Sequence, residues 1–395
     1  MAQPVRIEPD VQFIRELQAA GGESLKKCYQ CATCSVACPI SPKDNPYPRK
    51  EMIWAQWGLK DKLVNDPDVW LCHNCGQCSD LCPRGAKPAD LMSAMRNMAY
   101  QKLVPCGSLS KWMSSPKGLL PLFAIPAVLF AVIWAIMYAI NFGGWYGQGS
   151  IFPSGTIVPG KIFYGDYTID PVFILVTVFI IVAFVKGVKS LIGSIKPEGS
   201  VMMLGKKKHI LRCLIEVVMF EIMPHTKFSE CGDGDDKKSR KIGHMCLLFG
   251  FIALAIVTGV FFIGHWAGRI PGLEFIYMEV PLPFTNPMKI LAQVGMVLLL
   301  VGLTMLTLRR TSLDPDKQTS SWYDWYLIGV IWAVAITGAL TQFFRLADWV
   351  VLTYVIYYLH LVTVFMLFAY LPWSKLGHLV YRTAAITYVR YMGRK

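Results

Sequence analysis

The distribution of apolar residues divides the chain into two parts near residue 110. Before that point, apolar and charged residues are interspersed, as in a domain that faces water. After it, long apolar runs alternate with short polar loops. Six runs reach the roughly 20 residues that a helix needs to cross about 30 Å of hydrocarbon. They cover residues 118–140, 171–192, 244–266, 288–308, 325–344 and 349–371. The pattern predicts a mainly α protein in which a six-helix transmembrane bundle follows an N-terminal domain.

The same change of pattern predicts the domain limits. Proline, glycine and serine crowd together in residues 106–117, so we expect a linker there. It would join an N-terminal domain of residues 1–105 to a membrane domain of residues 118–395. Between the second and third spans, residues 209–223 have apolar-periodic positions but also carry two glutamates. This combination predicts an amphipathic helix lying along the membrane surface.

Composition and charge support a membrane location. Hydrophobic residues make up 54% of the 395 residues and charged residues only 16%, which excludes an ordinary soluble globular protein. The net charge is +13, and lysine and arginine are concentrated in residues 186–241, 309–317 and 375–395. Loops 141–170 and 269–287 carry very little positive charge. We therefore expect a multi-pass protein of the cytoplasmic (inner) membrane with both termini in the cytoplasm. Contact with anionic membrane lipid accounts for the basic excess, and no nucleic-acid binding is expected.

Two copies of the pattern C-x2-C-x2-C-x3-C-P lie in the N-terminal domain. The first motif contains Cys28, Cys31, Cys34 and Cys38, and the second contains Cys72, Cys75, Cys78 and Cys82. This spacing is typical of a domain that holds two [4Fe–4S] clusters, with the fourth cysteine of each run bound to the other cluster. The motifs predict a two-cluster, ferredoxin-like helical iron–sulfur domain.

Geometry explains why the fourth cysteine crosses over. Three cysteines separated by two residues can curl around one cluster, while a rigid proline carries the fourth cysteine away. We expect one cluster to be held by Cys28, Cys31, Cys34 and Cys82, and the other by Cys72, Cys75, Cys78 and Cys38. Zinc is the alternative, but it takes its four ligands in two separated pairs more often than in runs of four. A disulfide framework is not expected, because the first residues do not resemble a secretory signal peptide.

Histidines on two of the predicted spans suggest a second kind of centre. His244 and His265 bracket the third span, His360 lies inside the sixth, and His378 follows it. A polar side chain at such positions is costly without a partner or a cofactor. Two histidines on one helix that face two on another can hold two stacked b-type haems. For each of these residues, the alternative to a haem ligand is a structural, hydrogen-bonded histidine.

We expect an inner pair, His244 with His378, and an outer pair, His265 with His360. The depths match only in part, because His360 would lie near mid-membrane and His265 near the outer surface. His225, which follows the amphipathic helix, is the reserve ligand. The two other histidines, His73 and His209, are interpreted as solvated or structural.

Other chemistry is not indicated by the sequence. It contains no G-x-G-x-x-G fingerprint, P-loop or nucleophile elbow, so we expect no flavin or nucleotide bound by this chain itself. Any substrate chemistry would then belong to partner chains. Four cysteines outside the motifs are interpreted as free thiols without a ligand role: Cys106, Cys213, Cys231 and Cys246. The segment 231–236, which contains three aspartates, is interpreted as a solvated turn.

Both halves resemble known families. Residues 28–96, with CYQCATCSVACP and CHNCGQCSDLCPRG, resemble the small iron–sulfur subunit of heterodisulfide reductase. Residues from about 244 onward resemble the haem b membrane subunits of respiratory nitrate reductase and of membrane-bound heterodisulfide reductase. That likeness rests on the segment from His360 to His378 and on Gly264 with His265. The sequence departs from the latter pattern on the third span, because the family's two histidines there lie about ten residues apart and position 254 is a leucine.

A chain that joins both modules is similar to a membrane subunit of the quinone-interacting membrane-bound oxidoreductase complexes of sulfate-reducing microbes. This resemblance implies menaquinone as substrate, cytoplasmic flavin and iron–sulfur subunits as partners, and exchange with adenylylsulfate reductase. The function we expect is electron transfer between the quinone pool, two b-type haems and two [4Fe–4S] clusters. Two alternatives remain open: a reductase of a small disulfide or other sulfur compound, and a membrane anchor without haem.

Overall fold

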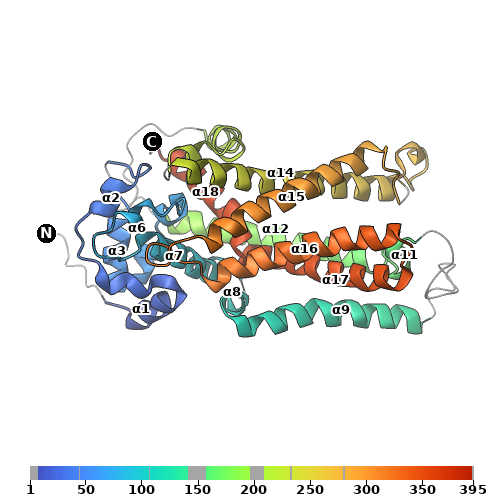
Figure 1. Cartoon of the computed structure of the whole chain (residues 1–395), viewed down its shortest axis with the longest axis horizontal. Helices are drawn as coiled ribbons and strands as arrows, with labels where there is room; N and C mark the ends of the chain where they lie inside the picture. Colours follow the sequence, from blue (N-terminus) through green and yellow to red (C-terminus); the bar gives the residue numbers. More distant parts are fainter. Residues whose placement is uncertain are drawn as a thin grey trace.

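The fold is helical throughout the part of the chain that can be described. A computed structural model describes residues 8–43, 45–105, 107–140, 157–195, 209–231, 234–278 and 281–393. Within these ranges the regular elements are α, 3-10 and π helices, with no strand. Figure 1 shows a domain of short helices at one end of a bundle of long helices. The last helix of the chain, α18 (His378–Tyr391), lies at the same end of the bundle as the first, α1 (Val11–Leu17).

The N-terminal domain is built around one buried helix. After α1 come α2 (Thr33–Ala37), α3 (Arg49–Gln56), α4 (Lys60–Val64), α5 (Asp68–Leu71), α6 (Gln77–Asp80) and α7 (Pro88–Leu103). Pro88 occupies the first turn of α7, where a missing backbone N–H removes no helical hydrogen bond. Almost every residue of α7 is buried, because the other short helices surround it.

Among the described residues, six helices are long and apolar enough to cross a membrane, which makes the chain a multi-pass membrane protein. They are α9 (Leu119–Ala139), α12 (Ile169–Ser194), α14 (Gly234–Ala267), α15 (Pro287–Thr311), α16 (Trp322–Leu346) and α17 (Val350–Ala369). Five of them lie within three residues of the expected limits at each end. The exception is α14, which begins at Gly234 rather than at residue 244. Part of the acidic segment expected as a turn therefore belongs to this helix, and Asp236 pairs with Arg309 of α15 at 2.9 Å.

The segment expected as a linker is folded and packed. It contains α8 (Ser108–Met113) and a 3-10 turn, η3 (Pro116–Gly118), whereas Cys106 lies outside the described residues. Ser110 and Met113 are fully buried. Just before the segment, the carbonyl of Pro105 accepts a hydrogen bond from the indole Nε1 of Trp373 at 2.7 Å. The segment between the two parts is thus itself helical and packed against them.

An aromatic joint connects the N-terminal domain to the bundle. Trp70 of α5 has its ring centroid 5.5 Å from Tyr100 of α7 and 5.4 Å from Tyr381 of α18. Tyr100 in turn lies 6.1 Å from Tyr323 of α16. These are distances of direct aromatic contact, and all four side chains are almost completely buried. The two parts therefore share one hydrophobic core.

Within the bundle, glycines allow α14 and α15 to approach closely. A Cβ on Gly302 would lie 2.6 Å from the carbonyl oxygen of Gly243, and one on Gly250 would lie 2.9 Å from the backbone nitrogen of Leu299. Small residues at helix contacts are the usual means of close packing in membranes. In Figure 1 this pair lies along one edge of the bundle, α9 lies along the opposite edge, and α12, α16 and α17 lie between them.

Between α12 and α14 the chain forms α13 (Ile210–Val217), which continues as a π-helical turn, η4 (Val218–Ile222). Its exposed face carries large apolar side chains, including Leu211, Ile215 and Phe220. Its other side packs on α18, and Glu221 forms an ion pair with Arg390 there. This is the amphipathic helix expected at residues 209–223, and its contact with a membrane surface stays a prediction.

Remaining short elements are α11 (Pro159–Ile162), the π turn η1 (Gln18–Gly22) and five 3-10 turns: η2 (Glu23–Lys27), η5 (Thr226–Ser229), η6 (Glu274–Ile276), η7 (Leu371–Trp373) and η8 (Lys375–Gly377).

Candidate functional site

The eight motif cysteines surround two cavities, and each cavity takes three cysteines from one motif and one from the other. Cavity A is lined by Cys28, Cys31, Cys34 and Cys82. Cavity B is lined by Cys38, Cys72, Cys75 and Cys78. The structure therefore brings together the crossed sets that the proline after each fourth cysteine leads us to expect. The cavities are neighbours, because Cys34 of α2 and Cys78 of α6 belong to one buried cluster.

The two motifs fold in the same way around their cavities. Gln30 and Ala32 of the first motif have positive φ angles of 60° and 70°, and so do the equivalent Asn74 and Gly76, at 49° and 92°. Left-handed residues at these positions turn the backbone around the cavity. As a result, the amide nitrogens of Gln30 and Asn74 each lie 3.4 Å from the sulfur of the first cysteine in their motif.

The donor set fits iron–sulfur clusters. Each cavity gathers four sulfur atoms, the ligand set of a [4Fe–4S] cluster. Burial raises the pKa of the Cys34 thiol to about 12 and that of the Cys38 thiol also to about 12. Buried thiolates need a compensating positive charge, which bound iron supplies.

The two cavities differ in access. At cavity A, Cys31 is exposed, as are the apolar side chains of Tyr29 (68% exposed) and Val36 (87%). Cavity B is covered by the membrane part of the chain, because Cys231 also lines it. On the bundle side, the guanidinium of Arg382 donates hydrogen bonds to the carbonyl oxygens of Leu71 and Cys72 at 3.3 and 3.4 Å.

Cys231 is a candidate functional residue to which the sequence interpretation gave no ligand role. The sequence suggests a free thiol without a role, but Cys231 is completely buried at cavity B and donates a hydrogen bond to the sulfur of Cys75. This hydrogen bond lowers the pKa of Cys75 and, together with burial, raises that of Cys231. No spacing rule could have found the contact, because it depends on how the segment before α14 folds onto the N-terminal domain.

Loss of this hydrogen bond should change the reduction potential of the cluster proposed for cavity B. Hydrogen bonds to cluster sulfurs raise that potential. A bond worth about 1 kcal/mol corresponds to roughly 40 mV for one electron, so Cys231→Ala should make the potential more negative by about that amount. A redox titration followed by electron paramagnetic resonance measures the shift. Cys231→Ser keeps a donor and should stay near wild type, as should Cys213→Ala, which removes another fully buried thiol. An unchanged potential in Cys231→Ala would contradict the role.

Three of the expected histidines meet at the end of the bundle that carries the N-terminal domain. His225 Nε2 lies 2.7 Å from His244 Nδ1. The rings of His244 and His378 face each other edge to face, with centroids 6.2 Å apart. The expected inner pair, His244 with His378, is thus brought together, and the reserve residue His225 joins it.

The hydrogen bonds of these rings leave nitrogen lone pairs available. His378 Nδ1 lies 2.6 Å from the carbonyl oxygen of Lys375, which can only accept, so Nδ1 carries the proton and Nε2 the lone pair. His225 Nδ1 donates in the same way to Met223 O at 3.3 Å. His225 Nε2 then accepts from His244 Nδ1, which leaves the lone pair of His244 on Nε2.

Carbonyl groups that fix the ring tautomer are the usual support of metal-bound histidines. Burial lowers the pKa of His378 to about 4 and also lowers that of His225. Both rings are therefore neutral at neutral pH, which is the form that binds metal.

The three histidines lie directly beside cavity B. The ring of Phe228 is 5.1 Å from His225, 5.1 Å from His244 and 5.4 Å from His73. His73 in turn lines cavity B and contacts the guanidinium of Arg382. Two side chains in mutual contact, Phe228 and His73, thus lie between these histidines and cavity B. Of the two roles considered for His73, solvated or structural, its enclosure at this junction favours the structural one.

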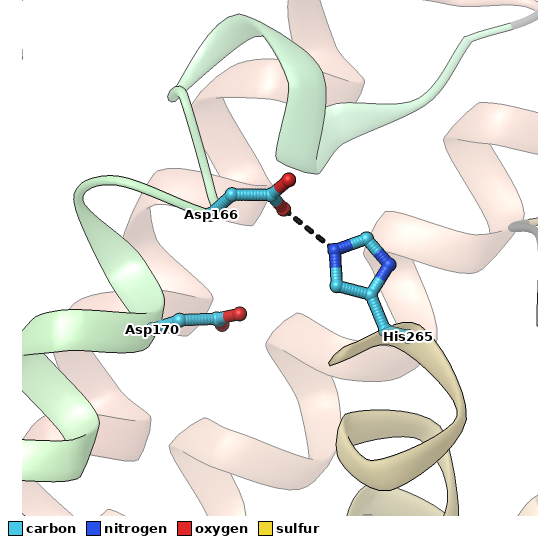
Figure 2. Close-up of side chains that lie close together, drawn as sticks. All are labelled: Asp166, Asp170 and His265. Atoms are coloured by element: carbon cyan, nitrogen blue, oxygen red, sulfur yellow. Dashed lines mark hydrogen bonds and ion pairs between the residues drawn. The ribbon is translucent and has the colours of Figure 1, made fainter. Parts of the chain in front are cut away.

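The expected outer pair is not brought together. Figure 2 shows His265, near the end of α14, pointing toward Asp166, with its Nε2 2.9 Å from the Asp166 carboxylate. Arg269 donates to the same carboxylate at 2.6 Å, and Trp266 Nε1 donates to Asp170 at 2.9 Å. Asp166, Asp170 and His265 are close enough to share a metal ion, but each already has a protein partner.

His360 lies in the middle of α17 instead. Its Nδ1 is 3.0 Å from the hydroxyl of Thr337 on α16, and a Cβ on Gly338 would approach its ring to 3.0 Å. It is ten residues from the start of α17, about 15 Å along a helix, whereas His265 is two residues from the end of α14. His360 therefore lies in the middle of its span and His265 near the end of its own, and this difference in depth, already evident in the sequence, explains why the two side chains do not meet.

Other ionisable residues near the ends of the spans are engaged in pairs. Glu216 bonds Arg212 at 3.0 Å, and Glu221 pairs with Arg390. His209 precedes α13 and is exposed.

Comparisons with known proteins agree with the geometry of the N-terminal domain. Residues 24–86, which include all eight motif cysteines, match the 4Fe-4S dicluster domain family. One subunit of the H(2):CoB-CoM heterodisulfide,ferredoxin reductase of Methanothermobacter marburgensis is 42% identical over 91 residues, covering 23% of this chain and 49% of that protein. A protein of Archaeoglobus profundus, named for its likeness to a heterodisulfide reductase subunit, is 36% identical over 100 residues, covering 25% and 51%.

A subunit of the ferredoxin:CoB-CoM heterodisulfide reductase of Methanosarcina mazei is 30% identical over 91 residues, covering 23% of this chain and 55% of that protein. The chain thus spans about half the length of the curated relatives it matches. No solved structure matches the chain. The chain carries an iron–sulfur domain like that of these heterodisulfide reductase subunits, joined to a multi-pass membrane part.

Proposed function

We propose that this chain is the membrane subunit of an oxidoreductase complex and passes electrons between a quinone pool, b-type haem and two [4Fe–4S] clusters. The cluster ligands are the four cysteines of cavity A and the four of cavity B. The haem site lies at His225, His244 and His378. The observation that carries the proposal is the position of these histidines, which are linked to cavity B through the contacting side chains of Phe228 and His73.

The positions of the proposed haem and cluster ligands define an order for electron transfer. Haem and iron–sulfur clusters supply one-electron chemistry, which suits the stepwise oxidation of a two-electron quinol. His244 and His378 would hold the haem iron at the membrane end, and Phe228 and His73 bridge toward cavity B. Cys34 and Cys78 bring the two cavities together. Cavity A, with its exposed Cys31, is then the exit to a soluble partner.

The partner would dock on the surface around cavity A. Tyr29 and Val36 expose apolar area there, and Arg84 lies over the Tyr29 ring at 4.2 Å. The relatives are subunits of multi-subunit reductases by their names. We therefore propose cytoplasmic flavin and iron–sulfur subunits as partners. The resemblance to quinone-interacting oxidoreductase complexes adds menaquinone, adenylylsulfate reductase and a role in dissimilatory sulfate reduction to the proposal.

The proposed location is the cytoplasmic membrane, with the N-terminal domain and α18 on the cytoplasmic side. Two observations support it: both lie at one end of the bundle, and the basic segments 309–317 and 375–393 lie at that end too. Thiols stay reduced on this side, as cluster ligands require.

Metal and haem analysis of the purified chain tests the proposal. We expect about eight irons in cluster form per polypeptide and at least one b-type haem visible in a reduced-minus-oxidised spectrum. Menadiol, a soluble menaquinol analogue, should reduce that haem. Two haems would require His360 to have a partner other than His265. Zinc in place of iron would overturn the proposal.

The same measurements would also identify either of two other functions. Eight irons without haem would identify a membrane anchor. A heterodisulfide or other sulfur-compound reductase would need an open position on a cluster, but each cavity already offers four cysteine ligands. Turnover of a small disulfide by the purified chain would favour that reductase.

A further inference from the structure

An apolar groove lies between α9, α16 and α17, at the end of the bundle near the N-terminal domain. It has a volume of about 610 Å³, within the range of small-molecule sites. Leu120, Phe123, Trp325 and Met366 are among the apolar residues that line it. Leu120 is 75% exposed, so the groove opens on the side of the bundle that faces lipid.

Two hydrogen-bond donors in this groove lack partners. The phenol oxygen of Tyr326 and the indole nitrogen of Trp322 are buried and make no hydrogen bond to any residue that the structure describes. Tyr326 is only 5% exposed, and both residues line the groove. They are four positions apart on α16, so they lie on one face of the helix about one turn apart. Unpartnered donors away from water are costly, which points to a ligand with acceptor atoms.

The groove also reaches the neighbourhood of His360. Thr363 lines it, and its hydroxyl lies 3.4 Å from that of Thr337. Thr337 contacts His360 Nδ1 at 3.0 Å. A molecule in the groove is therefore connected through two hydroxyls to the histidine in the middle of α17.

We propose that the groove binds the ring of an isoprenoid quinone, with Tyr326 and Trp322 donating hydrogen bonds to its carbonyl oxygens and the tail leaving toward lipid. This assignment rests on the proposed function. An acyl chain would leave both donors unpaired, because it has no acceptor. A phospholipid phosphate would require a cation, and none of the residues that line the groove is a lysine or an arginine. A neutral carbonyl compound matches two neutral donors in an apolar groove.

Filling the groove tests the assignment. Gly329 lines it, and a Cβ there would meet no atom within 4 Å, so Gly329→Phe occupies the space without a backbone clash. Gly259→Phe on α14 is the matched control, since its Cβ also meets nothing within 4 Å. We expect Gly329→Phe to reduce the rate of haem reduction by menadiol at least tenfold and to lose co-purifying quinone. Reduction by dithionite should remain complete, and Gly259→Phe should behave as wild type.

Tyr326→Phe separates hydrogen bonding from shape. Loss of one donor should raise the menadiol concentration for half-maximal rate about fivefold to tenfold and change the maximal rate little. If wild type is reduced by menadiol and Gly329→Phe is equally active and retains its quinone, the groove assignment is wrong and the proposed function stands. The assignment is also wrong if Gly329→Phe loses bound phospholipid rather than quinone. If wild type itself contains no quinone and is not reduced by menadiol, the quinone function fails.

Discussion

The His244→Ala variant is expected to lose the b-type haem absorbance of the bundle end that carries the N-terminal domain, while its iron–sulfur content stays at the wild-type level. His244 contacts His225 through a 2.7 Å hydrogen bond and faces His378, so it is the centre of the proposed haem site. Alanine offers no ligand. Haem extracted per polypeptide and the reduced-minus-oxidised spectrum measure the effect.

The partners of His244 sharpen this expectation. His378→Ala should cause the same loss, because the lone pair on its Nε2 makes it the proposed second ligand. His225→Ala should retain haem but weaken its binding, by about tenfold to a hundredfold, since His225 orients His244. His209→Ala removes an exposed histidine and should have no effect. Unchanged haem content in His244→Ala would refute the site.

Cys82→Ala is expected to remove the cluster of the first motif, although Cys82 belongs to the second. The reason is that Cys82 lines cavity A, together with Cys28, Cys31 and Cys34. By the same argument, Cys38→Ala should remove the cluster of the second motif. Each variant should retain about four of eight irons. Iron analysis and electron paramagnetic resonance of the reduced protein measure the loss.

Comparison of spectra decides which cysteines act together. Cys82→Ala and Cys28→Ala should leave the same remaining signal, whereas Cys38→Ala should match Cys72→Ala. Cys213→Ala, which removes a buried thiol outside both cavities, should keep all iron. If Cys38→Ala instead matches Cys28→Ala, each cluster is held within one motif and the crossed arrangement is refuted.

The features that could be predicted from the sequence depend on the spacing of residues that are close together along the chain. Cysteines three residues apart must line one turn of chain, and a proline after the fourth fixes its direction, so the grouping around cavities A and B follows from a dozen residues. The six spans follow similarly from the length of each apolar run. His244 and His378 could be paired because the predicted third span begins at His244 and His378 follows the predicted sixth span, on the same side of the membrane.

The features that escaped prediction depend on tertiary packing. Cys231 meets Cys75 only because the segment before α14 folds over the N-terminal domain. His265 looked like a ligand by its position, but the loop before α12 brings Asp166 to it. Residues 106–117 have the composition of a linker, yet Met113 is buried in the core shared by both parts. The spacing of residues along the chain does not indicate these contacts, because each joins segments that are distant in the sequence.

The joint formed by Trp70, Tyr100, Tyr323 and Tyr381 constrains how the protein is made. Because these rings are buried between the N-terminal domain and the bundle, neither part can be completed without the other. Cys231 and Arg382 then close over cavity B. We therefore expect a preformed cluster to enter that cavity before the two parts dock, so that cofactor loading precedes final membrane assembly of this chain.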